Sequence, residues 1–153
     1  VGIAPILNLH NHLLEKKIEH YLIMGARHTR EHFLDHNEKK RILLSTDDGS
    51  IGVKGNVVDV LNLFIRDNYK NYKIFSCGPP MMMNSVSDFA SKNNMSCDLA
   101  VETIMACGIG ICQGCTVERK LNKNAKKHSY RNKYALACID GPIFSASDIQ
   151  KCI

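Results

Sequence analysis

The sequence predicts an α/β fold: a doubly wound parallel sheet without its first strand over residues 1–95, then a small β-rich module over 96–153. Three observations predict it. Apolar runs alternate with helical patterns up to about residue 95, which is typical of parallel strands joined by crossovers. The first element is a helix with no strand before it. Beyond residue 95, short strand patterns surround a loop of cysteines and glycines.

The chain opens with alternating helices and strands. Residues 4–20 have apolar side chains at helical spacing, with Pro5 in the first turn. Residues 21–26 form an apolar run that ends in glycine and alanine, as expected of a strand buried on both faces. A short helix over 29–36 and a second buried strand over 41–46 follow.

The same alternation continues to residue 94. Residues 47–56 form a turn-rich loop with three glycines, and 57–67 an amphipathic helix. A third strand is predicted over 72–78, and a helix over 80–94. A doubly wound sheet normally opens with a strand that leads into a phosphate-binding turn, and that strand is missing here.

The second module is predicted to be built from short strands without helices. Strand patterns occupy 96–102, 116–120 and 134–144. The loop between the first two of these strands carries the clearest chemical signal in the chain.

Composition restricts the class of protein. The chain is 44% hydrophobic and 23% charged, which suits a soluble globular protein of one or two domains. It has no apolar run of about 18 residues and no signal-peptide pattern, so we expect a cytoplasmic protein that does not bind membranes. Seven cysteines without an export signal favour reduced thiols and metal ligation. The first residue is not Met, and we expect a fragment of a longer protein.

A net charge of +5 suggests acidic partners, but no coherent basic face with aromatic residues predicts nucleic-acid binding. The one basic run, 119–133, has seven Lys or Arg and no acid. It is interpreted either as a docking surface for an acidic partner or as a solvated hairpin tip, and the second reading is preferred.

The cysteine loop reads "MACGIGICQGC" from Met105 to Cys115. Its thiols follow the spacing C-x4-C-x2-C, with a fourth 23 positions later, which is the plant-type pattern for a [2Fe–2S] cluster. The predicted ligands are Cys107, Cys112, Cys115 and Cys138.

The loop glycines support this interpretation. Gly108, Gly110 and Gly114 are expected to allow positive φ angles, so that backbone N–H groups point at sulfur. Structural zinc remains the alternative, although zinc sites usually divide their ligands into two short pairs. A chance group of buried cysteines is disfavoured by the interleaved glycines.

The other cysteines and the histidines carry weaker signals. Cys97 is expected in the core, and Cys152 is expected to have no specific role. Cys77 lies at the carboxyl end of a predicted strand, where ligands of open α/β sheets bind. The histidines at 28, 32 and 36 lie at helical spacing and are interpreted as a solvated helix face.

Several stretches together resemble a known family. Four stretches resemble the nucleotide-binding half of the ferredoxin-reductase family: "GIAPIL", "GAR", "STDDGSIGVKG" and "CGPPMM" (2–7, 25–27, 45–55 and 77–82). The cysteine loop with "ACIDGPIF" (137–144) is similar to a narrower group, the electron-transfer subunits of NAD-dependent dihydroorotate dehydrogenases. The resemblance covers essentially the whole chain.

The resemblance implies a ferredoxin-reductase-like, Rossmann-like nucleotide-binding domain over 1–95 and a [2Fe–2S] module over 96–153. It implies that the cluster ligands are the four cysteines named above. It also implies contacts to nicotinamide nucleotide and flavin, from Gly2, Ala4, Pro5, Gly25, Ala26, Arg27, Cys77, Gly78, Pro79 and Met82.

The implied function is an electron relay in pyrimidine (UMP) biosynthesis. Electrons pass between NAD and the FMN of a dihydroorotate-oxidising partner subunit, through FAD and the cluster. The chain is then an electron-transfer component rather than the catalytic subunit, and no residue need act as a general acid or base. The family's FAD-binding barrel is absent, so most of the FAD site is expected outside the chain.

Two other functions remain open. One is an iron–sulfur flavin reductase that uses NAD(P)H to reduce ferredoxin or a sulfur compound; the other is a zinc-stabilised binding module. The sequence also gives conflicting indications about whether the nucleotide is NAD or NADP. Arg27 and Arg30 without an adjacent acid argue locally for NADP, whereas the resemblance argues for NAD, which we prefer.

Overall fold

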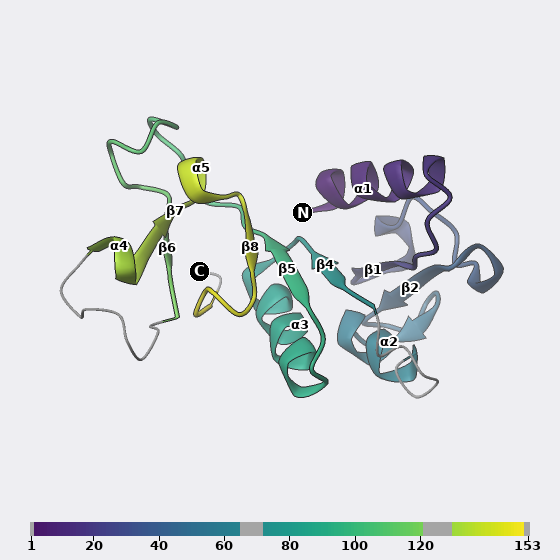
Figure 1. Cartoon of the computed structure of the whole chain (residues 1–153). Helices are drawn as coiled ribbons and strands as arrows, with labels where there is room; N and C mark the ends of the chain where they lie inside the picture. Colours follow the sequence, from purple (N-terminus) through teal and green to yellow (C-terminus); the bar gives the residue numbers. More distant parts are fainter. Residues whose placement is uncertain (1, 65–71, 121–129, 152–153) are drawn as a thin grey trace. The chain divides into compact units, whose positions relative to one another are not determined.

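The computed structural model describes residues 2–64, 72–120 and 130–151. The chain forms two compact units: the first unit comprises residues 7–70, and the second unit comprises residues 1–6 and 71–153. Figure 1 shows the elements of each. No helix in the described part of the chain is long and apolar enough to cross a membrane.

Helix α1 spans Ile3–Glu15 and is shorter than the predicted 4–20. It ends because Lys17 takes a left-handed conformation, with φ of 56°. The Ile18 N–H then donates to the carbonyl of Leu13, which closes the last turn.

The first unit contains a three-stranded parallel sheet in the order β1–β2–β3. Its strands are β1 (Leu22–Ala26), β2 (Ile42–Thr46) and β3 (Val53–Lys54), followed by helix α2 (Val57–Phe64). The strands at 21–26 and 41–46 are confirmed as parallel neighbours, in the register Leu22↔Ile42. The most buried apolar side chains of this unit are Leu43, Leu44 and Val60, at most 1% exposed.

The prediction of a helix over 29–36 is wrong. Only a 3-10 turn, η1, forms over Thr29–Glu31, and a second, η2, over Glu38–Lys40. The intervening histidines bond to the backbone of β2 rather than to solvent, because the chain here runs alongside that strand.

The second unit contains a mixed sheet in the order β4–β5–β8. Strands β4 (Ile74–Ser76) and β5 (Cys97–Ala100) are parallel and joined by helix α3 (Pro80–Lys92). Strand β8 (Ile143–Ser145) pairs antiparallel with β5. The parallel α/β arrangement predicted from the sequence is confirmed.

A two-stranded antiparallel ribbon completes the second unit. It consists of β6 (Thr116–Glu118) and β7 (Tyr134–Leu136). Two four-residue helices flank β7, α4 (Tyr130–Lys133) and α5 (Ala137–Asp140), so the prediction of a helix-free module is wrong. The reason is local: α5 is a single turn, too short for a periodic pattern to show in the sequence.

Candidate cluster and nucleotide sites

The cysteine loop connects β5 to β6 in the second unit. Gly108 and Gly110 have φ of 68° and 79°, as predicted, but the third left-handed residue is Gln113, with φ of 59°. Gly114 does not have a positive φ, and its predicted conformational role is wrong. A polar residue can take this conformation because Gln113 lies in a tight turn, where its carbonyl accepts a hydrogen bond from the Thr116 hydroxyl.

Gly110 also lies close to the turn that carries Cys138. A Cβ at this position would overlap the tip of Ile139, which lies on α5. The loop therefore packs against this turn, and a side chain at Gly110 would require the Ile139 side chain to move.

Two of the four predicted ligands are in contact. The Sγ atoms of Cys115 and Cys138 lie 3.2 Å apart. The ribbon aligns them, because Thr116 pairs with Leu136 and the Ala137 N–H donates to the Cys115 carbonyl at 2.9 Å.

The other two thiols are held by backbone N–H groups. The Cys112 N–H donates to the Cys107 sulfur, and the Gly114 N–H to the Cys112 sulfur, each at 3.4 Å. Such N–H groups favour negatively charged sulfur. The pKa of Cys107 is accordingly lowered to about 6, chiefly by the Cys112 N–H.

The paired thiols differ in proton affinity. The backbone N–H of Cys138 lowers the pKa of Cys115, while the hydrogen bond with Cys115 raises the pKa of Cys138. The Cys115 sulfur therefore favours the thiolate form, and the Cys138 sulfur keeps the proton that the two share.

This donor set fits a [2Fe–2S] cluster in type and number: four thiols, three of them on a loop whose N–H groups already face sulfur. Within the described ranges, no three His, Cys, Asp or Glu side chains converge as a complete set of metal ligands. The pairwise arrangement, two sulfurs in contact and two held by N–H groups, is what the fold itself provides.

The carboxyl end of β4 holds another group of predicted contact residues. Cys77 and Gly78 are buried there, and Pro79 caps α3. Gly2 lies against the Cys77–Gly78 peptide so closely that a Cβ would overlap its backbone, so only glycine fits at Gly2. The fold thus brings together two segments that lie 75 residues apart in the sequence.

Cys77 is the titratable residue of this group. Burial raises the pKa of its thiol, with the charge of Glu102 acting in the same direction. The thiol is therefore neutral and is not a nucleophile. Met82 is half-buried on α3, while Ala4 and Pro5 are exposed in the first turn of α1.

The remaining predicted contacts, Gly25, Ala26 and Arg27, lie in the first unit at the carboxyl end of β1. A carboxylate is present here that sequence reasoning overlooked: Glu31 Oε2 accepts the Arg27 N–H at 2.9 Å. The η1 turn brings it back, whereas the predicted helix would have carried it away.

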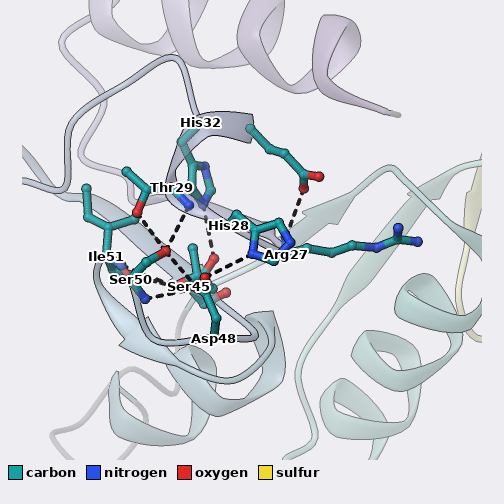
Figure 2. Close-up of polar contacts among 10 residues, drawn as sticks. Arg27, His28, Thr29, His32, Ser45, Asp48, Ser50 and Ile51 are labelled. Atoms are coloured by element: carbon teal, nitrogen blue, oxygen red, sulfur yellow. Dashed lines mark hydrogen bonds and ion pairs between the residues drawn. The ribbon is translucent and has the colours of Figure 1, made fainter.

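Polar side chains join this turn to the loop after β2, as Figure 2 shows. His28 Nδ1 lies 2.9 Å from Asp48 Oδ2, and Asp48 Oδ1 accepts the Ser50 hydroxyl at 2.6 Å. The Ser50 oxygen accepts in turn from the Thr29 N–H and hydroxyl, at 2.9 and 2.7 Å. The ends of β1 and β2 are thereby held together.

This network changes the proton affinity of two exposed groups. The hydrogen bond to Asp48 raises the pKa of His28. Hydrogen bonds from Ser50, then His28, lower the pKa of Asp48. Each of these two groups therefore favours the charged form of the other.

The interpretation of the histidines as a solvated helix face is wrong. His32 Nε2 lies 3.1 Å from the Ser45 carbonyl, and His36 Nδ1 accepts the Leu44 N–H at 3.0 Å. Cys97 is buried, as predicted. Cys152 and the centre of the basic run, 121–129, lie outside the described residues.

A family match was found for the C-terminal part of the chain. Residues 102–150 match the family described as the iron–sulfur cluster binding domain of dihydroorotate dehydrogenase B. The matched region includes all four cysteines predicted as ligands.

Nearly the whole chain is similar to curated electron transfer subunits of dihydroorotate dehydrogenase B (NAD(+)). Identity is 33% to a probable one from Archaeoglobus fulgidus, over 97% of this chain and 58% of that protein. It is 30% to one from Fusobacterium nucleatum, over 98% and 54%. It is 35% to a probable one from Methanocaldococcus jannaschii, over 94% and 51%. The chain thus spans just over half the length of these relatives.

A solved chain of an NADH-dependent reduced ferredoxin-NADP oxidoreductase has the same fold. The TM-score is 0.74 and the identity 24%, over 98% of this chain and 51% of that one.

Proposed function

We propose that the chain is part of an electron-transfer subunit that connects NAD to a dihydroorotate-oxidising partner, on the premise that residues 102–150 match the iron–sulfur cluster binding domain of dihydroorotate dehydrogenase B. The relatives are named as such subunits. The observation that carries the proposal is the thiol geometry: a contact of 3.2 Å between Cys115 and Cys138, beside two sulfurs that accept backbone N–H groups.

The cluster site consists of Cys107, Cys112, Cys115 and Cys138. When bound, a [2Fe–2S] cluster accepts and donates single electrons. The chain's own part is to present four sulfurs from one loop and one turn, and to direct N–H groups at them so that negative charge is stabilised. Packing of Gly110 against Ile139 keeps the loop and the turn together.

The nucleotide and flavin contacts are assigned to the carboxyl ends of β1 and β4, where ligands of open α/β sheets bind. Gly25, Ala26 and Arg27 would flank the adenosine ribose of NAD. Cys77, Gly78, Pro79 and Met82 would lie near the nicotinamide and flavin rings, and Gly2, Ala4 and Pro5 near the pyrophosphate. The neutral, buried state of Cys77 suits an apolar wall beside a ring rather than chemistry of its own.

We place the nucleotide-binding domain at 1–95 and the cluster module at 96–153. Strand β5 crosses this boundary, since it pairs in parallel with β4 of the domain and antiparallel with β8 of the module. The compact units divide the chain differently because β5 holds both sides together.

A strand that would open the nucleotide-binding sheet is placed before Gly2, and most of the FAD site with it. In the described part of the chain, β1 pairs with β2 alone and β4 with β5 alone. Each of these strands therefore has a free edge at which a further parallel strand can pair. The relatives are nearly twice as long as this chain, which leaves room for such a strand.

The partner is proposed to be an FMN-containing, dihydroorotate-oxidising subunit, in a cytoplasmic hetero-oligomer of pyrimidine biosynthesis. The cysteine loop offers an apolar contact surface: Ile109 is 67% exposed and Ile111 76% exposed. Part of the basic run, including Arg119 and Arg131, adds positive charge to the same unit and would speed association with an acidic partner.

The test is reconstitution of the full-length protein, purified anaerobically, with its dihydroorotate-oxidising partner. About two irons and two sulfides are expected for each chain. The mixture is expected to reduce NAD⁺ with dihydroorotate, and neither protein alone should do so.

Ile109→Asp is expected to uncouple this transfer while leaving the visible spectrum of the cluster intact. Gln150→Asp, an exposed position elsewhere in the second unit, is the control. A protein that does not bind the partner but reduces ferredoxin or a sulfur compound with NADH or NADPH would replace this function with that of a flavin reductase. One zinc and no sulfide would exclude both.

A further inference from the structure

The turn that carries Cys138 contains a carboxylate for which the proposed function has no use. Asp140 is the last residue of α5, and its Oδ2 accepts the Leu136 N–H at 2.8 Å. This hydrogen bond closes the α5 turn. Leu136 immediately precedes the helix, and the leucine side chain cannot cap the helix itself. Cys138 lies midway between the two bonded residues.

The same turn is fixed from outside at its first residue. The Ala137 N–H donates to the Cys115 carbonyl, and Leu136 pairs with Thr116 across the ribbon. Asp140 therefore connects the far end of the turn to a point held by the β6–β7 ribbon. With both ends fixed, the Cys138 sulfur has little freedom to leave the Cys115 sulfur.

A cation faces this carboxylate. Arg119, which follows β6, has its Nη2 3.7 Å from Asp140 Oδ2. The arginine is anchored through its backbone, which donates to the Lys133 carbonyl at 2.7 Å and bridges to Ile149. Its Nε is buried without a hydrogen-bond partner in the described residues, so the guanidinium charge is only partly compensated.

We propose that Asp140 is a positioning residue for the cluster: its carboxylate holds the turn that presents Cys138 to Cys115, and the Asp140–Arg119 pair sets the local charge beside that ligand. The inference rests on the proposed function for its redox part. Charges close to a cluster shift its reduction potential, a negative charge lowering it and a positive charge raising it.

The positioning part is tested without the cluster. In the reduced, iron-free chain, oxidised glutathione converts the Cys115 and Cys138 thiols to a disulfide and is itself reduced to two molecules of glutathione. The rate is followed by alkylation of the remaining thiols and peptide mass spectrometry.

Asp140→Ala is expected to slow this disulfide about tenfold, because the two sulfurs are no longer held in contact. Asp140→Asn is expected to react like the wild type, since its amide oxygen still accepts the Leu136 N–H. Asp148→Ala, which removes an exposed carboxylate bonded only to the neighbouring Ser147 side chain, is the matched control. An unchanged rate in Asp140→Ala would overturn the positioning role.

The charge part is tested on loaded protein by redox titration of the cluster. Asp140→Asn is expected to raise the potential and Arg119→Gln to lower it, with wild-type iron and sulfide in both. A merely structural role predicts no such opposite shifts. Equal potentials in all three proteins would overturn the charge role, whereas failure to bind iron at all would overturn the proposed function and leave the disulfide result to decide the positioning role.

Discussion

The cysteine loop of the second unit is held differently from the carboxyl edge of the β1–β2–β3 sheet in the first. At the sheet edge, β2 is buried from Leu43 to Thr46, and side chains of Thr29, Asp48 and Ser50 bond directly to one another. In the cysteine loop, large apolar side chains are exposed, and the polar contacts are N–H groups directed at sulfur.

The difference separates two ways of building a site. The sheet edge is completed by the protein's own contacts. In the cysteine loop site, two sulfurs contact each other and the other two are held by N–H groups. The arrangement of all four sulfurs therefore depends on the group that binds them. The following changes test this contrast, from the largest expected effect to the smallest.

The largest effect is expected from removal of one cluster ligand. Cys138→Ser should lose most of the bound iron and sulfide, because no other cysteine in the described chain contacts Cys115. Iron and sulfide analysis and the visible spectrum measure it. Cys152→Ser is the control and should retain both; equal losses in the two variants would contradict the ligand assignment.

A smaller but substantial effect is expected from a cavity in the sheet. Leu44 is 0% exposed, and Leu44→Ala should lower the free energy of unfolding by about 2–5 kcal/mol. Leu63→Ala, at a side chain 49% exposed on α2, should cost less than about 1 kcal/mol. Urea denaturation of the two variants provides the comparison, and similar losses would show that the first unit is not packed as described.

Removal of the cluster should affect one region only. Amide hydrogen exchange of residues 105–115 is expected to accelerate about tenfold or more when iron is removed, because the N–H groups then face uncharged or mobile sulfur. The amides of β2 should be unchanged, since their bonds lie within the other unit. Acceleration in β2 as well would mean that the cluster stabilises the entire chain.

The smallest effect concerns the exposed His28–Asp48 pair. The pKa of His28 is raised above 6.5, so its contribution to stability is complete at lower pH and is lost as the pH rises through the folded-state value. The pKa of Asp48 is lowered from 3.8, so its contribution is present above that value and is lost as the pH falls below it. The pair therefore stabilises the edge most between about pH 4 and 6.5.

NMR titration of the histidine ring measures this interaction. Asp48→Asn should lower the pKa of His28 toward its ordinary value, whereas Asp47→Asn, the neighbouring exposed carboxylate, should change it less. An unshifted His28 in the wild type would show that the bond does not persist in solution.

Patterns local in the sequence determined much of this protein. The β1, β2 and β4 strands and helix α3 follow from apolar runs and from Pro80, because strand and helix periods are properties of neighbouring residues. The prediction of the cluster ligands rests on a local signature as well: three thiols within nine residues, with glycines between them, of which Gly108 and Gly110 take positive φ.

Only the tertiary structure decided contacts between segments distant in sequence. The contact of Gly2 with Cys77 and Gly78, the pairing of β8 with β5, and the ion pair of Asp140 with Arg119 all depend on chain reversals that no local period encodes. The segment 29–36 shows the physical reason. Its spacing suits a helix, but bonds from His32 and His36 to the backbone of β2 hold it as a 3-10 turn followed by irregular backbone instead, because tertiary hydrogen bonds outweigh a weak local helix preference.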